Sequence, residues 1–189
     1  MVGPYATVRL SDNVFWQSRA AWGRSSNTVS PFLAFTDSFT STRWLATSGL
    51  TGRCSFSALT FSPSASVSYI SDTSESYADT FGELIPAVTS SFGQVKAGPE
   101  ISYRWDLGPG VTGEPRAAAD LIWTVASDAT GQTGVGTTGP GGLRGKVELG
   151  PKIGAASGVS ADVSGSYDGI GPPGYSATTG SASLRVPLN

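Results

Sequence analysis

Residues 95–107 alternate without interruption between two kinds of side chain. The odd positions hold Val95, Ala97, Pro99, Ile101, Tyr103, Trp105 and Leu107, and the even positions hold Lys96, Gly98, Glu100, Ser102, Arg104 and Asp106. Because successive side chains of a strand project to opposite faces, this segment is predicted to be one strand with an apolar face and a charged face. At about 3.3 Å per residue and a tilt of about 40°, it rises roughly 33 Å, enough to cross an apolar band of about 25 Å.

The same alternation recurs at residues 59–69, 116–125, 143–153 and 159–168. Short turns alternate with long loops, chiefly residues 25–39 and 72–93, as in outer-membrane barrels. The predicted fold class is therefore all-β, an antiparallel up-and-down transmembrane β-barrel with nine or ten strands present. The predicted strands lie near residues 3–11, 13–24, 40–51, 58–71, 94–107, 115–127, 142–155, 158–168 and 175–188.

Composition excludes several other classes of protein. The 189 residues suit one domain, the formal charge of −2 offers no basic footprint for nucleic acid, and no apolar run reaches the roughly 18 residues of a transmembrane helix. The chain has no histidine, which excludes Ser-His-Asp and Cys-His catalysis and histidine-ligated metal sites. Its single cysteine, Cys54, lies in a predicted turn at residues 52–56.

Residues 134–139 have the GxGxxG spacing of a dinucleotide-binding loop. They are followed by Pro140 and a strand pattern rather than by a helix that could hold pyrophosphate, so we interpret the match as coincidental. We therefore predict no enzyme activity, no catalytic residue, no cofactor and no metal site.

Aromatic residues fall near both ends of the predicted strands. If the C-terminus is periplasmic, Trp22, Trp44, Tyr69, Trp123, Tyr167 and Tyr175 lie toward the extracellular ends, and Trp16, Phe61, Tyr103 and Trp105 lie toward the periplasmic ends. Two aromatic belts at the lipid–water interfaces would produce this distribution. The same orientation starts the first strand outside, whereas bacterial barrels have an even strand number with both ends inside. At least one strand is thus expected upstream of residue 1.

The charged residues of the predicted strands occupy the same alternate positions as the other polar residues, which we call the polar parity, and so share one face. An Arg or Lys that faced lipid at the bilayer midplane would cost roughly 2 to 4 kcal/mol, so parity and energetics both direct these side chains into a hydrated lumen. Two interpretations of that lumen stay open, a translocation pore and a salt-bridged plug without a transport role. The predicted lumen-facing residues are Arg19, Arg43, Lys96, Glu100, Arg104, Arg116, Asp120, Arg144, Lys146, Glu148 and Asp162.

Diffuse strand motifs occur along nearly the whole chain. They include Gly3-Pro4-Tyr5, residues 9–15, 20–25, 42–45, 50–52, 59–69, 98–103 and 166–171, and the closing Leu184-Arg185-Val186-Pro187-Leu188. Together these stretches resemble the β-domain of autotransporters, the type V secretion barrels of proteobacterial outer membranes.

The resemblance implies a twelve-stranded pore that carries a covalently attached passenger to the cell surface, with a helix from the passenger side filling the lumen. Residues 1–189 would then be one outer-membrane β-barrel domain that lacks its N-terminal strands. The implied partners are membrane lipid, the outer-membrane barrel assembly machinery and an upstream passenger domain, without nucleic acid. The chain departs from the family in its low strand count, in having no helical segment before Tyr5, and in ending with Leu188-Asn189 rather than an aromatic residue.

Two other functions stay open. A stand-alone structural or adhesive surface barrel would use its long loops, chiefly residues 72–93, to contact partners. A soluble lipocalin-like binding barrel would instead place the apolar parity inside.

Overall fold

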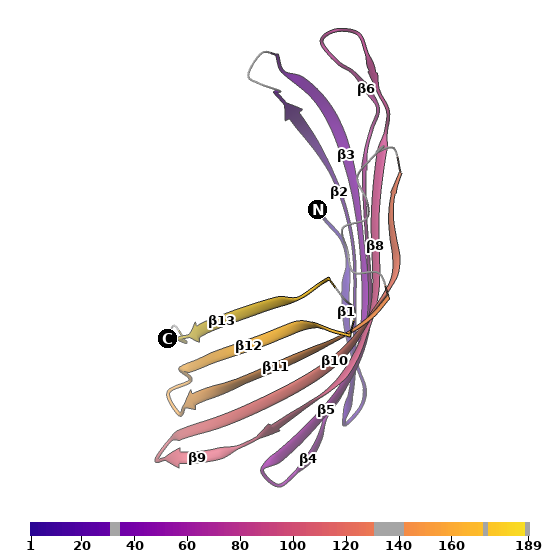
Figure 1. The fold of residues 1–189 in the computed structure, drawn as a ribbon. Helices are drawn as coiled ribbons and strands as arrows, with labels where there is room; N and C mark the ends of the chain where they lie inside the picture. Colours follow the sequence, from indigo (N-terminus) through magenta and orange to yellow (C-terminus); the bar gives the residue numbers. More distant parts are fainter. Residues whose placement is uncertain (31–34, 131–141, 172–173, 188–189) are drawn as a thin grey trace.

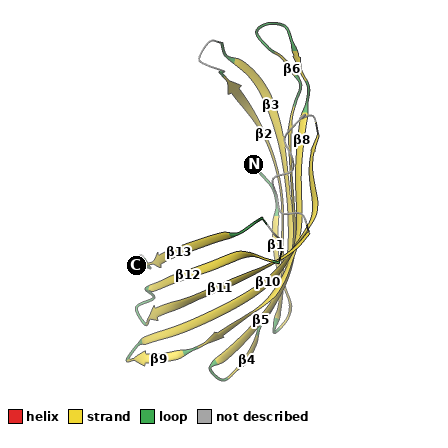
Figure 2. Ribbon diagram, viewed as in Figure 1, coloured by secondary structure: helices red, strands yellow, loops and turns green. Residues whose placement is uncertain are grey.

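The computed structural model describes residues 1–30, 35–130, 142–171 and 174–187, and every regular element in them is a strand (Figure 1, Figure 2). These residues contain no helix long and apolar enough to cross a membrane. The strands are β1 (Tyr5–Ser11), β2 (Val14–Val29), β3 (Asp37–Gly52), β4 (Cys54–Phe56), β5 (Leu59–Ser74), β6 (Tyr77–Ala78), β7 (Leu84–Ile85), β8 (Val88–Tyr103), β9 (Trp105–Gly108), β10 (Val111–Thr130), β11 (Gly142–Ala155), β12 (Ser160–Ile170) and β13 (Ala177–Arg185).

Nine of these strands lie side by side in sequence order, β1-β2-β3-β5-β8-β10-β11-β12-β13, and each pairs antiparallel with the next. β4 and β9 extend the sheet by pairing with β5 and β10, while β6 and β7 form a separate hairpin. Figure 1 shows the sheet strongly curved, with one concave face and one convex face. The predicted all-β, antiparallel up-and-down architecture is confirmed.

The sheet is open in this structure. β1 and β13 stand at the two ends of the strand order, and within the described residues no ladder joins them. Because the path between them holds an odd number of antiparallel strands, these two edge strands run in the same direction.

Antiparallel register keeps the polar parity on one face across the sheet. Ser66 pairs with Gly49 and Lys96, for example, while the adjacent Val67 pairs with Ser48 and Val95. Among the described side chains, the buried apolar ones are few, whereas many large aliphatic residues of the other parity are exposed. The buried ones are Ala21 and Ile122, and exposed examples are Leu121 at 59 %, Leu143 at 60 % and Leu149 at 63 %. This facing is opposite to that of a soluble lipocalin-like barrel, whose apolar side chains lie inside.

The strands differ in length, and this gives the sheet a tall side and a short side. β2, β3, β5 and β8 have 16 residues each and β10 has 20, whereas β11 has 14, β12 has 11 and β13 has 9. We call β2 to β10 the tall side. Its strands continue into residues that the sequence pattern assigned to the long loops 25–39 and 72–93, so those loop boundaries were wrong.

The reason is a loss of contrast between the two faces at the end of the tall side that holds residues 25–29 and 37–41. We call this the far end. There Ser26 pairs with Thr40 on one parity and Ser25 pairs with Ser41 on the other. With small hydroxyl side chains on both faces, the alternation disappears although the ladder of backbone hydrogen bonds continues.

The hairpin between β4 and β5 is tighter than predicted. Cys54 lies in β4, opposite Phe61, rather than in a turn. The turn follows at Ser57, whose φ of 56° is a left-handed conformation that is costly for a residue with a side chain. The GxGxxG match at residues 134–139 lies outside the described residues.

Candidate functional site

The concave face carries all eleven charged residues that were predicted to share one face. A single row of paired positions illustrates this, since Ser66, Lys96, Ile122 and Arg144 lie opposite one another from β5 to β11. The full set is Arg19 on β2, Arg43 on β3, Lys96 and Glu100 on β8, Arg104 directly after β8, Arg116 and Asp120 on β10, Arg144, Lys146 and Glu148 on β11, and Asp162 on β12.

An ion network centred on Arg116 joins four of these strands. The Nη2 atom of Arg116 lies 2.9 Å from a carboxylate oxygen of Asp162 and 3.7 Å from one of Glu148, and its Nη1 atom lies 4.0 Å from Glu100. Lys146 adds a second cation 3.0 Å from Glu148. The network therefore connects β8, β10, β11 and β12, and the charges of its members largely cancel within the wall.

Arg144 is the most buried cation of this region, with 9 % of its side chain exposed. Its Nε donates to Asp168 at 2.9 Å, its Nη1 donates to Thr124 at 3.3 Å, and its guanidinium lies 5.7 Å from the centre of the Tyr175 ring. Tyr175 was predicted to belong to the outer aromatic belt. That prediction is wrong, because its ring covers a cation of the concave face.

Lys96 and Asp120 form a further ion pair between β8 and β10, with 2.9 Å between Nζ and the carboxylate. Asp120 has only 9 % of its side chain exposed. From β8 to β12, therefore, most charged side chains of the concave face have a partner of opposite sign on a neighbouring strand.

The part of the face formed by β1 to β5 is different. β1 and β2 contain no carboxylate, and the carboxylates of β3 and β5, Asp37 and Asp72, lie near the far ends of those strands. Arg43 pairs with Asp72, but Arg19 has no ion-pair partner among the described residues.

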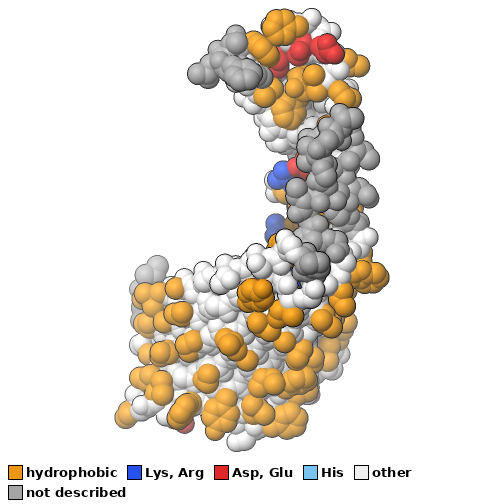
Figure 3. All heavy atoms as spheres, in the orientation of Figure 1, with side chains coloured by type: hydrophobic (Ala, Val, Ile, Leu, Met, Phe, Trp, Pro, Cys, Tyr) orange, Lys and Arg blue, Asp and Glu red, His pale blue; other side chains and the backbone are white. Residues whose placement is uncertain are grey.

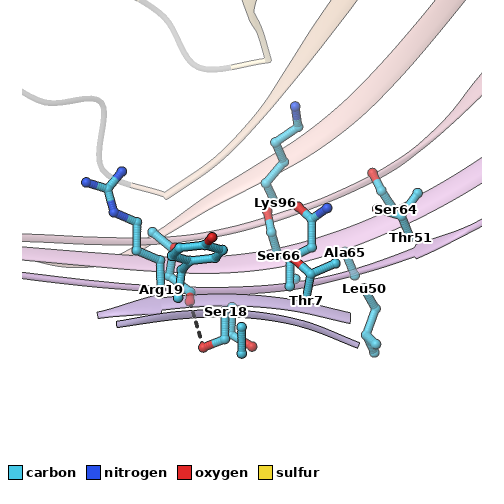
Figure 4. Close-up of a pocket in the computed structure, with 15 residues that line it drawn as sticks. Thr7, Ser18, Arg19, Leu50, Thr51, Ser64, Ala65, Ser66 and Lys96 are labelled. Carbon is cyan, nitrogen blue, oxygen red and sulfur yellow. Dashed lines mark hydrogen bonds between the residues drawn. The ribbon is translucent and has the colours of Figure 1, made fainter. Parts of the chain in front are cut away.

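A groove of about 450 Å³ lies between Arg19 and Lys96. In the close-up of Figure 4, both side chains rise from the same side of the sheet, while Leu50 points to the opposite side. The floor between the two cations is made of small residues such as Gly49 and Ser66. This region is thus a weakly cationic surface that offers hydroxyl groups rather than paired charges.

The convex face is apolar and has aromatic residues at two levels. At the far level, the exposed rings of Trp22 and Trp44 lie 6.3 Å apart on adjacent strands. At the opposite level, Phe56, Tyr103 and Trp105 are 65 %, 50 % and 61 % exposed. An apolar band with aromatic rings at both edges is the surface that a transmembrane barrel presents to lipid.

Three further charged residues make contacts on the concave face but lie outside the predicted lumen-facing set. Asp72 pairs with Arg43, Asp168 with Arg144, and Glu114 accepts a hydrogen bond of 2.7 Å from Ser102. Asp168 falls on the polar face of the predicted alternation at residues 159–168, whereas the other two fell in segments predicted as connections. No group of three or more Cys, Asp or Glu side chains in the described ranges could hold a metal ion.

A comparison with known protein families gives a match. The family described as "Autotransporter beta-domain" matches residues 1–168. Searches of curated proteins and of solved structures found no significant match.

Proposed function

The chain belongs to the autotransporter β-domain family of bacterial outer-membrane translocators, and from this premise we propose that it forms the wall of a pore that exports an N-terminally attached passenger to the cell surface. Membership places the protein in the bacterial outer membrane and makes it a β-barrel domain of type V secretion. The export of a passenger by this chain is the proposed step.

The observation that carries the proposal is the division of the sheet into two faces. An exposed apolar convex face with aromatic residues at both edges suits lipid, and a concave face with paired charges suits water. Membrane lipid is therefore the proposed partner of the convex face. We propose that the eleven charged residues from Arg19 to Asp162 line the lumen.

The tall side supports an orientation for the barrel. Beyond Trp22 and Trp44 the ladder continues with polar side chains on both faces, as in Arg24 and Thr42, which are paired on the convex parity. Polar strands that extend past the apolar band are typical of the extracellular side, where barrel loops are long. We therefore propose that the far end of β2 to β10 lies outside the cell and that the turns at residues 12 and 57 lie in the periplasm.

The open edges bear on how the barrel closes. Since β1 and β13 run in the same direction, an all-antiparallel barrel needs an odd number of additional strands between them. Three upstream strands would give the twelve that the family resemblance implies. We propose that such strands complete residues 1–189, and that the outer-membrane barrel assembly machinery inserts the whole barrel.

This proposal involves no catalytic step, cofactor, metal or nucleic acid. The family is one of translocators, and the polar concave face supports passage of a polypeptide through water. A second interpretation of the same wall is a stand-alone surface barrel. It predicts that no passenger domain lies upstream of residue 1.

The experiment that separates these two uses the full-length protein. An epitope placed upstream of the barrel should become accessible to protease on intact cells, while the barrel itself stays folded and shows heat-modifiable migration on gels. A control with the same epitope on a barrel carrying Val67→Arg, which is expected to block assembly, should show no surface signal. A folded barrel whose epitope stays inside the cell would contradict export and favour the stand-alone barrel.

A further inference from the structure

A small hairpin projects from the far end of the tall side and is fastened to β3. It is formed by residues 75–87, between β5 and β8, and it contains β6 and β7. Thr80 donates a hydrogen bond of 2.6 Å to Asp37, which is 8 % exposed. The ring of Tyr77 stacks on that of Phe39 with 5.4 Å between their centres. These contacts hold the base and one flank of the hairpin against the sheet.

The turn of the hairpin is also fixed. One carboxylate oxygen of Asp79 accepts hydrogen bonds from the backbone N–H groups of Phe81 and Glu83, at 2.9 and 2.8 Å. The backbone N–H of Asp79 donates to the carbonyl of Glu83, and Gly82 supplies the positive φ of 80° that the turn requires. The turn is therefore ordered before any partner binds, which lowers the entropic cost of binding.

This fixed turn displays large apolar side chains to water. Phe81 is 77 % exposed and Leu84 is 70 % exposed, although the ring of Phe35 lies edge-on to that of Phe81 at 5.0 Å between ring centres. We call residues 78–84 the hairpin tip. Figure 3 shows apolar and acidic side chains gathered together at this end of the molecule. An ordered, protruding pair of apolar residues is typical of a site that enters a pocket on a partner.

The position of the tip argues against lipid as that partner. Trp44 marks the edge of the apolar band, and Asp37, to which the hairpin is fastened, lies seven residues further along β3. At about 3.3 Å per residue this is roughly 23 Å of strand beyond the band. The tip therefore stands in water, beyond reach of the acyl chains.

The charge around the tip indicates the chemistry of the partner. Residues 72–95 contain four carboxylates and no Lys or Arg. Asp72 pairs with Arg43, and Glu75 lies 3.3 Å from Arg24. The other two carboxylates, Asp79 and Glu83, have no ion-pair partner among the described residues and stand directly beside Phe81 and Leu84. The apolar pair is thus surrounded by uncompensated negative charge, which favours a cationic partner.

We propose that the hairpin tip is a binding site for a cationic polypeptide with an apolar surface. Phe81 and Leu84 enter the apolar part of that partner, and the carboxylates of Asp79 and Glu83 pair with surrounding Lys or Arg side chains. This function is separate from export, because it requires only that the hairpin be folded outside the membrane.

The test uses the full-length protein in nanodiscs of zwitterionic phosphatidylcholine, with a synthetic amphipathic peptide of Lys and Leu as the probe. Fluorescence anisotropy should show binding that weakens at high salt. The double variant Phe81→Ser with Leu84→Ser should lower the affinity by about tenfold or more. Glu83→Lys should lower it by roughly three- to tenfold and reduce its dependence on salt.

The matched control is Phe56→Ser, which removes an aromatic ring of similar exposure at the opposite end of the sheet and should leave the affinity unchanged. Heat-modifiable migration confirms that each variant is folded. The proposal is overturned if the double variant binds the peptide as the unmodified protein does, or if a peptide of Glu and Leu binds as tightly. It is equally overturned if Phe56→Ser causes the same loss, or if empty nanodiscs account for the signal.

Discussion

The concave face has two regions that are built on the same strand alternation but carry charge differently. From β8 to β12, cations and carboxylates pair at 2.9 to 4.0 Å, mostly between adjacent strands, with Arg116–Asp162 reaching across β11 and Lys146–Glu148 lying along it. From β1 to β5 the face holds many hydroxyl groups, and Arg19 lies there without an ion-pair partner among the described residues, between the Arg9–Asp12 and Arg43–Asp72 pairs. The comparison shows that the alternation along each strand decides which face is polar. The identity of the neighbouring side chains then decides whether the charges on that face are paired.

The largest expected effect tests the facing on which both regions depend. Val67 is on the convex parity of β5 and is 46 % exposed, whereas Ser66 is on the concave parity beside Lys96. Val67→Arg should abolish assembly, because a cation facing lipid near the midplane costs roughly 2 to 4 kcal/mol, and Ser66→Arg should be tolerated. Heat-modifiable migration of the full-length protein in outer membranes measures both. Equal tolerance of the two variants would refute the assignment of faces.

The next effect compares one ion pair from each region. Arg144 and Asp168 have 9 % and 17 % of their side chains exposed, and Arg43 and Asp72 have 52 % and 31 %. Arg144→Met should lower the free energy of unfolding by about 2 to 4 kcal/mol, because it leaves the largely buried carboxylate of Asp168 without its cation. Arg43→Met should cost about 1 kcal/mol or less. Urea unfolding of the full-length barrel in detergent micelles provides the measurement, and similar losses would show that the regions do not differ.

A smaller effect compares the two arginines that differ most in their partners. Arg116→Met leaves Glu100, Glu148 and Asp162 close together without their shared cation, so we expect a loss of roughly 1 to 3 kcal/mol at low salt. High salt should reduce this loss by screening the repulsion. Arg19→Met should change the stability by less than about 0.5 kcal/mol. The same urea titrations at two ionic strengths test both, and a large cost for Arg19→Met would mean that it has a partner in the complete barrel.

The smallest effect lies in the turn that precedes β5. Ser57 adopts a φ of 56°, which glycine tolerates without strain, so Ser57→Gly should raise the free energy of unfolding by about 0.5 to 1 kcal/mol. The adjacent Ala58→Gly, at a position without positive φ, is the control and should give no gain. Unfolding midpoints measure the two variants. A gain for Ala58→Gly alone would contradict the assignment of strain to Ser57.

The alternation of β5, β8, β10 and β11 was sufficient to predict the faces, because a period of two puts every second residue on the same side whatever the tertiary structure. It was insufficient beyond Trp22 and Trp44. There both faces carry small polar side chains, such as Ser26 and Thr40 on one face and Ser25 and Ser41 on the other. Without a difference between the faces, the sequence carries no period to read.

Contacts between distant segments were also beyond the sequence pattern. The hairpin of β6 and β7 has two residues in each strand and depends on Asp37 and Phe39, which are some forty residues away. Likewise Tyr175 lies in a connection, so strand parity could not place its ring over Arg144. The partners of Arg116 follow only once the register of four strands is known.

The unequal height of the strands shapes the mouth of the proposed pore. β2 and β3 continue seven residues past Trp22 and Trp44, whereas β12 ends three residues past Tyr167. The described part of the rim is therefore high along β2 to β10 and low along β11 to β13. A polypeptide leaving such a mouth would meet the extended strands β2 to β10 on one side and, among the described residues, the shorter strands β11 to β13 on the other, so the barrel itself would bias the direction in which the passenger leaves.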